Sequence, residues 1–322
     1  MFAGESASNA GVSAPDDPAP VIQVRGLRMR YGEHDVLSGV DLHVRRGEVV
    51  TLLGPNGAGK TTTIEVLEGF RRPSAGDIEV LGVDPLHADE PWRARVGVVL
   101  QSWRDHARWS PRDLLDHLGA YYAAFSTAER PRPVPTGELL DLVGLGDAAD
   151  QRILTLSGGQ RRRLDVAVGI VGRPEVLFLD EPTAGFDPQA RREFHELVHR
   201  LTDLEATTVL LTTHDLAEAE RLADRILILA GGRIVADGSA DALARRIRAN
   251  AEVRWTHDGQ RFVHATDDAT AYVRQLLADH PRGIEELEVR RASLEDTYLE
   301  LVRAHLDAEV AHTPVGLVSG EA

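Results

Sequence analysis

The only lysine of this chain lies inside a glycine-rich segment. Residues 54–61 fit the pattern G-x-x-x-x-G-K-[ST], and Lys60 is the single lysine among 322 residues. The segment follows an apolar run at 49–53 and precedes a helical stretch at 61–67, as a phosphate-binding loop requires. Its glycines let backbone N–H groups surround a phosphate chain, and the helix N-terminus favours anions. We expect Lys60 to reach the β- and γ-phosphates of a nucleotide and the Thr61 hydroxyl to hold Mg²⁺.

Two carboxylates follow another apolar run. Residues 176–179 are Val-Leu-Phe-Leu, and Asp180 and Glu181 come directly after them. At the end of a buried strand, Asp180 is the expected Mg²⁺ ligand and Glu181 the carboxylate that polarises an attacking water. The alternative is a solvated acidic pair at a strand end. The phosphate loop upstream favours the catalytic interpretation.

A second anion site is predicted at residues 156–160, which read Leu-Ser-Gly-Gly-Gln. Ser157 offers a hydroxyl, and Gly158 and Gly159 offer backbone N–H groups at the start of a helix that runs through residues 162–170. One chain therefore carries two phosphate-binding surfaces.

The order of these motifs resembles that of the ATP-binding subunits of ABC transporters. The phosphate loop, Gln101, the Leu-Ser-Gly-Gly-Gln signature, Asp180-Glu181 and His214 occur in the family's order, and the resemblance covers residues 21–238. It implies an α/β fold, a P-loop NTPase core of the ABC ATPase type with an inserted helical lobe, and it implies ATP and Mg²⁺ as ligands. In the family, two subunits face each other head to tail, so each ATP lies between one subunit's phosphate loop and the other's signature. A homodimer or a pseudo-symmetric ATPase pair is therefore expected.

The resemblance also implies a set of site residues. The expected catalytic residues are Glu181, His214 and Gln101, and the expected Mg²⁺ ligands are Thr61, Gln101 and Asp180. Contacts with ATP are expected from Tyr31, Gly54, Pro55, Asn56, Gly57, Ala58, Gly59, Lys60, Thr61, Thr62, Ser157, Gly158, Gly159, Gln160 and Asp187. Tyr31 would stack on adenine and His214 would contact the γ-phosphate. Three alternatives stay open: Tyr31 as a core aromatic, His214 as a strand-end histidine satisfied by its neighbours, and Asp187 as a helix cap.

Composition excludes several classes of function. The chain has 36 basic and 51 acidic residues, a net charge of −15, so binding of nucleic acid through bulk charge is not expected. It has no cysteine, which excludes disulfides, thiolate nucleophiles and zinc thiolate sites. No apolar run approaches the ~18 to 20 residues of a membrane helix. We expect a cytoplasmic protein that lies peripherally on the cytoplasmic face of the cell membrane.

The family resemblance, together with shifts in composition along the chain, predicts the domain organisation. Residues 1–20 form a disordered N-terminal lead, 21–238 an ABC ATPase domain with a helical lobe at about 101–156, 239–306 a small C-terminal α+β domain, and 307–322 a tail. Helices are expected at 111–125 and 138–143 in the lobe. In the C-terminal domain, strands are expected at 253–255, 261–264 and 284–290, and helices at 241–248, 271–278 and 294–305.

An ATPase of this type, without membrane spans, needs a separate membrane-spanning permease, which in the family docks at the helical lobe. Trp103 and Trp109 at the lobe entrance either form a hot spot for that contact or pack the lobe. Residues 292–301 resemble a C-terminal segment of exporters of drugs, antibiotics and polysaccharides, or form an ordinary amphipathic helix. We expect the ATPase of a drug or antibiotic exporter. The alternatives are a non-transport ABC ATPase and an exporter of polysaccharide or lipid.

Overall fold

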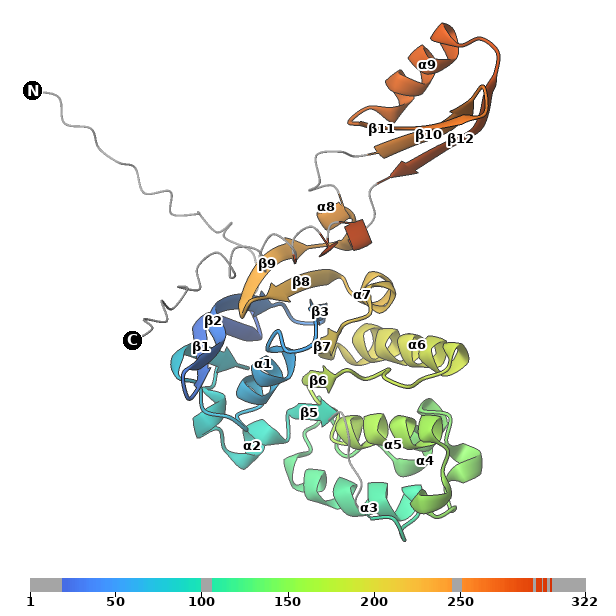
Figure 1. The fold of residues 1–322 in the computed structure, drawn as a ribbon. Coiled ribbons are helices and arrows are strands. Elements are labelled where there is room, and N and C mark those ends of the chain that lie inside the picture. Colours follow the sequence, from blue (N-terminus) through green and yellow to red (C-terminus); the bar gives the residue numbers. More distant parts are fainter. Residues whose placement is uncertain are drawn as a thin grey trace, which may run out of the picture.

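Two sheets and a helical lobe form the main body of the protein (Figure 1). The computed structural model describes residues 19–99, 106–244, 251–291, 294–296, 298–299 and 302. The strands are β1 (Ile22–Tyr31), β2 (His34–Val44), β3 (Val49–Leu53), β4 (Ala75–Val80), β5 (Val96–Val99), β6 (Val176–Asp180), β7 (Thr208–Thr213), β8 (Arg225–Ala230), β9 (Arg233–Gly238), β10 (Ala251–His257), β11 (Gln260–Thr266) and β12 (Ile284–Arg291). The helices are α1 (Lys60–Leu67), α2 (Glu90–Arg93), α3 (Pro111–Tyr122), α4 (Thr136–Leu142), α5 (Gly158–Ile170), α6 (Pro188–Glu205), α7 (Leu216–Leu222), α8 (Ala240–Ala244) and α9 (Ala269–Asp279).

The larger sheet has six strands in the order β5-β6-β7-β3-β8-β9. All neighbours are parallel except β8 and β9, which form a hairpin. Every residue of β3, β6 and β7 is buried, because helices or the second sheet cover both faces and a continuous apolar run can fill such a position. The α/β fold of a P-loop NTPase core, which the family resemblance implied, is confirmed.

The smaller sheet was not anticipated from the sequence. Its strands are antiparallel in the order β2-β1-β4, and Ile22 pairs with both Val44 and Val80. One face of this sheet packs with α1 against the larger sheet, in an apolar cluster that includes Leu37, Ile64 and Leu52. The two sheets thus enclose α1 and the phosphate loop that precedes it.

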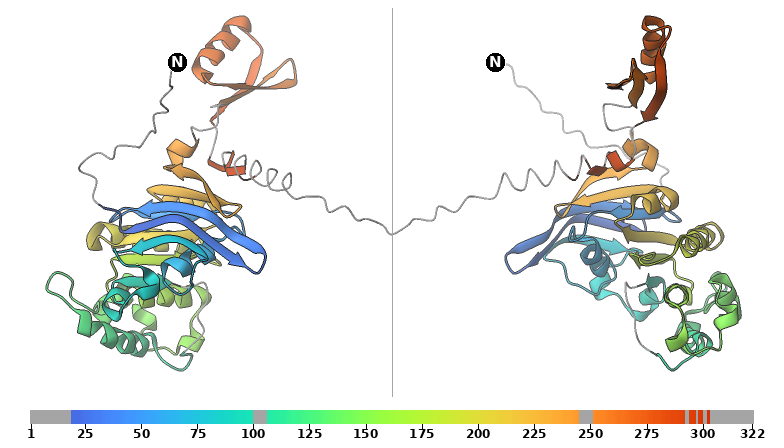
Figure 2. Two further views of the ribbon diagram at one scale, coloured as in Figure 1. Left: turned by 90° about the vertical axis from the view of Figure 1, so that its left-hand side faces the viewer. Right: turned by 45° about the vertical axis from the view of Figure 1, so that its right-hand side comes forward.

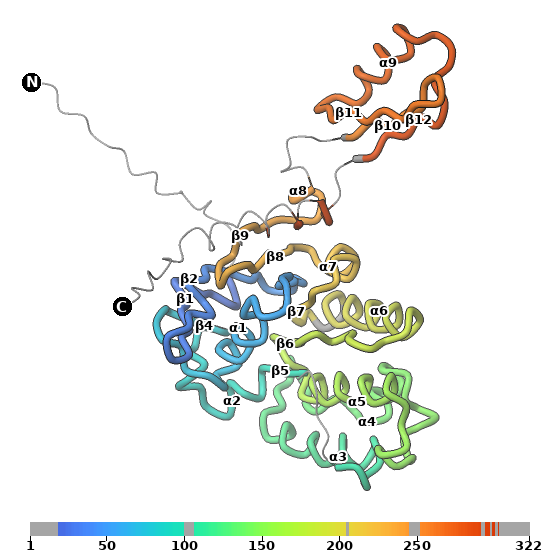
Figure 3. Tube along the Cα trace, in the orientation of Figure 1, coloured from blue at the N-terminus to red at the C-terminus, as the bar shows by residue number. Residues whose placement is uncertain are grey.

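The helical lobe is inserted between β5 and β6, as the tube in Figure 3 shows. α3 begins with a capping box in which the Ser110 and Asp113 side chains each accept a hydrogen bond from the other residue's backbone N–H. α4 starts two residues before the predicted position. α5 begins with a second capping box, formed by Ser157 and Gln160. These caps satisfy N–H groups that a helix end leaves unpaired, so the signature motif itself fixes where α5 starts.

The C-terminal unit is a three-stranded antiparallel sheet, in the order β11-β10-β12, with α9 packed on it. In both views of Figure 2 it stands clear of the two other sheets. After this unit the chain returns to the main body, where Leu294 is buried beside Leu243, Ile226 and Ile228. The expected strands and the 271–278 helix are present with extended bounds, whereas only Ala240–Ala244 is described as helix in the expected 241–248 stretch.

Within the described ranges, no helix combines the length and the apolar character needed to cross a bilayer. The expected N-terminal lead, apart from residues 19 and 20, lies outside the described residues, as do Gln101, Trp103 and the predicted tail.

Candidate functional site

The phosphate loop connects β3 to α1 in a conformation that its glycines permit. Gly57 and Gly59 have φ angles of 81° and 101°, in the region that residues with a side chain rarely adopt. A Cβ atom on Gly59 would lie 2.6 Å from a methyl carbon of Leu37. The Lys60 ammonium is 5% exposed and donates hydrogen bonds to the carbonyls of Gly54 (2.9 Å) and Pro55 (3.2 Å). The loop therefore keeps a buried cation at its centre.

Asp180 and Thr61 meet across the end of the parallel sheet. The Thr61 hydroxyl donates to Asp180 Oδ2 at 3.0 Å, and the Thr212 hydroxyl donates to Asp180 Oδ1 at 2.6 Å. Asp180 is 4% exposed. A carboxylate and a hydroxyl in contact are the oxygen ligands that Mg²⁺ prefers, so the residues present fit the ion.

Glu181 lies between Lys60 and His214. Its Oε1 atom is 3.4 Å from Lys60 Nζ and 3.4 Å from His214 Nδ1. Its φ angle is +44°, a left-handed conformation that is uncommon for a residue with a side chain and is concentrated at functional sites. The structure thus brings together five predicted residues: Lys60, Thr61, Asp180, Glu181 and His214.

A further carboxyl group, Glu68, ends α1 near this cluster. Burial, with the charge of Asp180 as a second cause, raises the pKa of Glu68 to about 8. Its Oε1 atom is buried and has no hydrogen-bond partner among the described residues. Burial therefore favours the neutral form of Glu68, which places no additional negative charge beside Asp180.

Tyr31 is the last residue of β1, and it is 40% exposed. It is therefore not the core aromatic of the alternative interpretation. The Arg71 guanidinium lies 5.2 Å from the centre of its ring and is held by Glu65 through an Nε–Oε2 contact of 2.6 Å. An exposed ring at this position is accessible for stacking.

The signature residues lie at the N-terminus of α5 and are exposed or half-buried. The space around a Cβ atom added to Gly158 or Gly159 is empty to 4 Å. In the described part of the chain, no hydrogen bond or ion pair joins residues 157–160 to the phosphate loop. The start of α5 is therefore exposed in a single chain.

Asp187 caps α6 and accepts hydrogen bonds from the backbone N–H groups of Gln189 and Ala190, each at 2.9 Å. These bonds lower the pKa of Asp187. The alternative interpretation of Asp187 as a helix cap is therefore correct in this structure. Trp109 is half-buried and packs against the lobe core between His106 and His117, which favours the packing alternative for this tryptophan.

Three residues near the cluster carry no motif signal of their own. Thr212 binds Asp180, and its hydroxyl also accepts from the Glu181 N–H at 3.0 Å. Glu218 is 2% exposed and accepts a hydrogen bond of 2.7 Å from Thr183, joining the segment after Glu181 to α7. The third, Arg162 on α5, donates to carbonyls around Glu181. Thr212 could have been identified because it is one of the polar residues that end the apolar strand β7. Arg162 could not, because it is one of three consecutive arginines and nothing in the sequence distinguishes it from the other two.

Curated relatives resemble this chain over most of its length. A daunorubicin/doxorubicin resistance ATP-binding protein of Streptomyces peucetius is 37% identical over 306 residues, which cover 90% of this chain and 91% of the relative. A Nod factor export ATP-binding protein I of Ralstonia nicotianae is 44% identical over 270 residues, 83% of this chain and 78% of the relative. A daunorubicin resistance ATP-binding protein of Streptomyces coeruleorubidus is 44% identical over 222 residues, 69% of each chain.

Solved structures agree with the fold. The structure of an ATP-binding subunit of an ABC transporter has a TM-score of 0.62 and 29% identity, and the match covers 70% of this chain and 92% of that one. An ATP-binding cassette of an ABC transporter in its ADP conformation has a TM-score of 0.60 at 22% identity, covering 70% and 92%. The sequence model of the family described as ABC transporter matches residues 37–184. The chain belongs to the ATP-binding subunits of the ABC transporter family and is an ATPase.

Proposed function

We propose that this chain hydrolyses ATP to drive a separate membrane-spanning permease that exports a drug-like compound. The observation that carries the catalytic part is the cluster at the ends of β3, β6 and β7, where Lys60 and His214 flank Glu181 and Thr61 contacts Asp180. The export part is supported by the relatives named for daunorubicin and doxorubicin resistance. The match to one of them covers 91% of that relative's length.

Each residue of the cluster has a role in this proposal. Lys60 compensates the charge of the β- and γ-phosphates, and the backbone N–H groups of the loop donate to them. Thr61 and Asp180 would hold Mg²⁺, with Gln101 as a further ligand, and the bound ion would neutralise charge on the phosphate oxygens.

Glu181 accepts a hydrogen bond from the attacking water and orients it. His214, 3.4 Å from the same carboxylate oxygen, holds that carboxylate and contacts the γ-phosphate. Tyr31 stacks on the adenine ring.

The second half of the site comes from another copy. The solved neighbours include a dimeric ABC transporter cassette, with a TM-score of 0.58 and 22% identity, which supports the fold-level comparison. Because Ser157 and Gly158 are exposed in one chain, and a Cβ atom added to Gly158 or Gly159 would meet nothing within 4 Å, we assign these residues to the nucleotide held by the partner's phosphate loop. The closed pair acts on the permease at the cytoplasmic face of the membrane.

Substitution of Glu181 tests the catalytic assignment. Glu181→Gln keeps the size of the side chain but removes its charge, so ATP turnover should fall by about 100-fold or more while ATP binding persists. Turnover and nucleotide affinity would be measured on the full chain, with Glu79→Gln as the control because Glu79 is an exposed carboxylate on β4. Wild-type turnover in Glu181→Gln would contradict the role of Glu181.

Nod factor export is the second candidate for the transported compound, because a relative of that name is 44% identical over 270 residues. Cells that carry the chain and its permease would be assayed for doxorubicin accumulation. Lys60→Ala should raise accumulation to the level of cells without the chain. Equal accumulation with wild type and Lys60→Ala would exclude the drug and leave the second candidate.

A further inference from the structure

One guanidinium holds the backbone on both sides of Glu181. Arg162 Nε donates to the carbonyl of Pro182 at 2.8 Å, and its Nη2 atom donates to the carbonyls of Asp180 at 3.2 Å and of Glu181 at 3.3 Å. The Arg162 residue is 7% exposed. Three consecutive carbonyls therefore converge on one buried cation.

This convergence matches the conformation of the segment. Glu181 adopts a φ of +44°, and such a conformation persists where the surroundings determine it. On the N–H side, Glu181 is held by the Thr212 hydroxyl at 3.0 Å. On the carbonyl side it is held by Arg162. The two sets of bonds fix the direction in which the Glu181 side chain leaves the backbone, toward Lys60 and His214.

The chemistry favours arginine at this position. A guanidinium presents N–H donors in a rigid plane, so Nε and Nη2 can serve separate acceptors at once. A lysine ammonium carries its three N–H donors on one nitrogen and cannot reproduce that spacing. The Asp165 carboxylate also faces this guanidinium, with its Oδ2 atom 3.7 Å from Arg162 Nη1, and burial raises the pKa of Asp165 to about 6.

We propose that Arg162 is a positioning residue for ATP hydrolysis, which sets the backbone of the Asp180–Pro182 segment so that the Glu181 carboxylate points at the attacking water. The inference rests on the proposed role of Glu181. Arg162 is five residues from Ser157 on the same helix, so the contact ties the signature helix to the catalytic carboxylate of the same chain.

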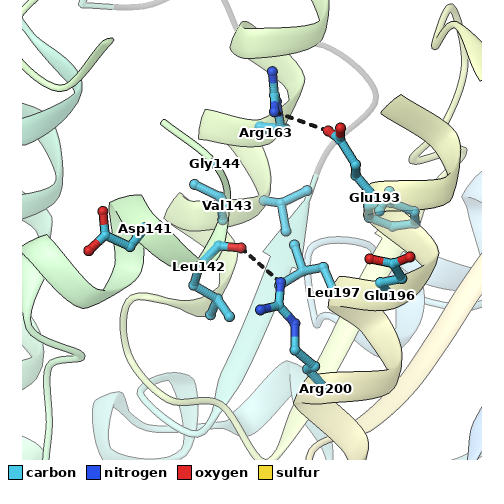
Figure 4. A pocket seen from close by; sticks show the side chains of 11 residues that line it. Asp141, Leu142, Val143, Gly144, Arg163, Glu193, Glu196, Leu197 and Arg200 are labelled. Atoms are coloured by element: carbon cyan, nitrogen blue, oxygen red, sulfur yellow. Dashed lines mark hydrogen bonds and ion pairs between the residues drawn. The ribbon is translucent and has the colours of Figure 1, made fainter. Parts of the chain in front are cut away.

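The neighbouring arginine provides a matched control. Figure 4 shows Arg163 directed toward Glu193 on α6, where its Nη1 atom lies 3.2 Å from Glu193 Oε2 at the border of a cavity of about 240 Å³. It shares the helix, the residue type and the charge of Arg162. No hydrogen bond described for Arg163 reaches residues 180–182.

The test compares Arg162→Lys with Arg163→Lys in the full chain. Arg162→Lys should lower kcat by about 10- to 100-fold, because small displacements of a catalytic group have effects of this size, while ATP affinity and the thermal midpoint stay near wild type. Arg163→Lys should keep kcat within about twofold. Arg162→Gln should lower kcat further; if it does not fold, Arg162→Lys decides the question.

The double variant separates positioning from general damage. When Glu181→Gln is already present, Arg162→Lys should cause no additional loss of turnover, because the carboxylate that it positions is gone. A wild-type kcat in Arg162→Lys would overturn the proposal. So would a parallel loss of ATP affinity and stability, or a loss that multiplies with that of Glu181→Gln. Failure of the proposed function is distinguishable, since Glu181→Gln alone would then retain turnover.

Discussion

His195 is a buried imidazole on α6 that the catalytic cluster does not use. It is 7% exposed, and its Nε2 atom has no hydrogen-bond partner among the described residues. Burial, with the nearby charges of Arg221 and Arg191, lowers the pKa of His195 to about 4. The unfolded chain, with an ordinary histidine pKa of about 6.5, therefore binds a proton in a pH range where the folded chain does not.

This linkage predicts an acid-sensitive fold. Because the unfolded state binds more protons between about pH 6.5 and pH 4, the free energy of unfolding should decrease as pH falls through that window, by about 1–3 kcal/mol from this residue. Urea unfolding across the window measures it. His195→Leu should flatten the dependence, whereas His34→Leu, at an exposed position on β2, should not. Equal slopes in the two variants would refute the assignment.

At the scale of elements, two glycines, Gly97 and Gly169, allow α5 to pack closely against β5. A Cβ atom on Gly97 of β5 would lie 2.2 Å from the carbonyl oxygen of Gly169, and one on Gly169 would lie 2.5 Å from a methyl carbon of Val99. The helix backbone thus rests directly on the strand. This close contact fixes the far end of the helix that begins with Ser157 and carries Arg162.

The segment after the C-terminal sheet is anchored by a leucine. Leu294 is 1% exposed in a cluster with Leu243 and residues of β8, whereas Leu299 is 42% exposed. Leu294→Ala should lower the free energy of unfolding by about 2–4 kcal/mol through lost burial and a residual cavity, and Leu299→Ala should have little effect. Denaturant unfolding of both variants measures this difference. Similar losses in the two variants would mean that the anchor does not contribute.

For the whole molecule, the sequence predicted those features that a short pattern encodes. The phosphate loop, the carboxylates after β6 and the capped start of α5 could be placed because motif and local structure coincide there. The antiparallel β2-β1-β4 sheet could not, because its strand order depends on pairing between distant segments such as Ile22 and Val80. The contacts of Arg162 and Leu294 were missed for the same reason, since each joins residues that are far apart in the chain.

In the whole molecule, the catalytic cluster and the signature lie at different places. The catalytic cluster lies at the end of the parallel sheet, whereas the signature lies at the start of α5 in the lobe region (Figure 1). In the proposed head-to-tail pair, each chain would offer its phosphate loop to one nucleotide and its signature to the other. A symmetric dimer of this kind contains two identical composite sites.

Mixing two inactive variants tests this arrangement most directly. Lys60→Ala disables the phosphate loop and Ser157→Arg blocks the signature, so each variant alone should be inactive. A mixed dimer contains one site built from an intact loop and an intact signature, and random pairing should restore about a quarter of wild-type turnover. If the mixture stays as inactive as its components while both variants bind each other, or if Ser157→Arg alone is fully active, ATP is hydrolysed within a single chain and the composite site is wrong.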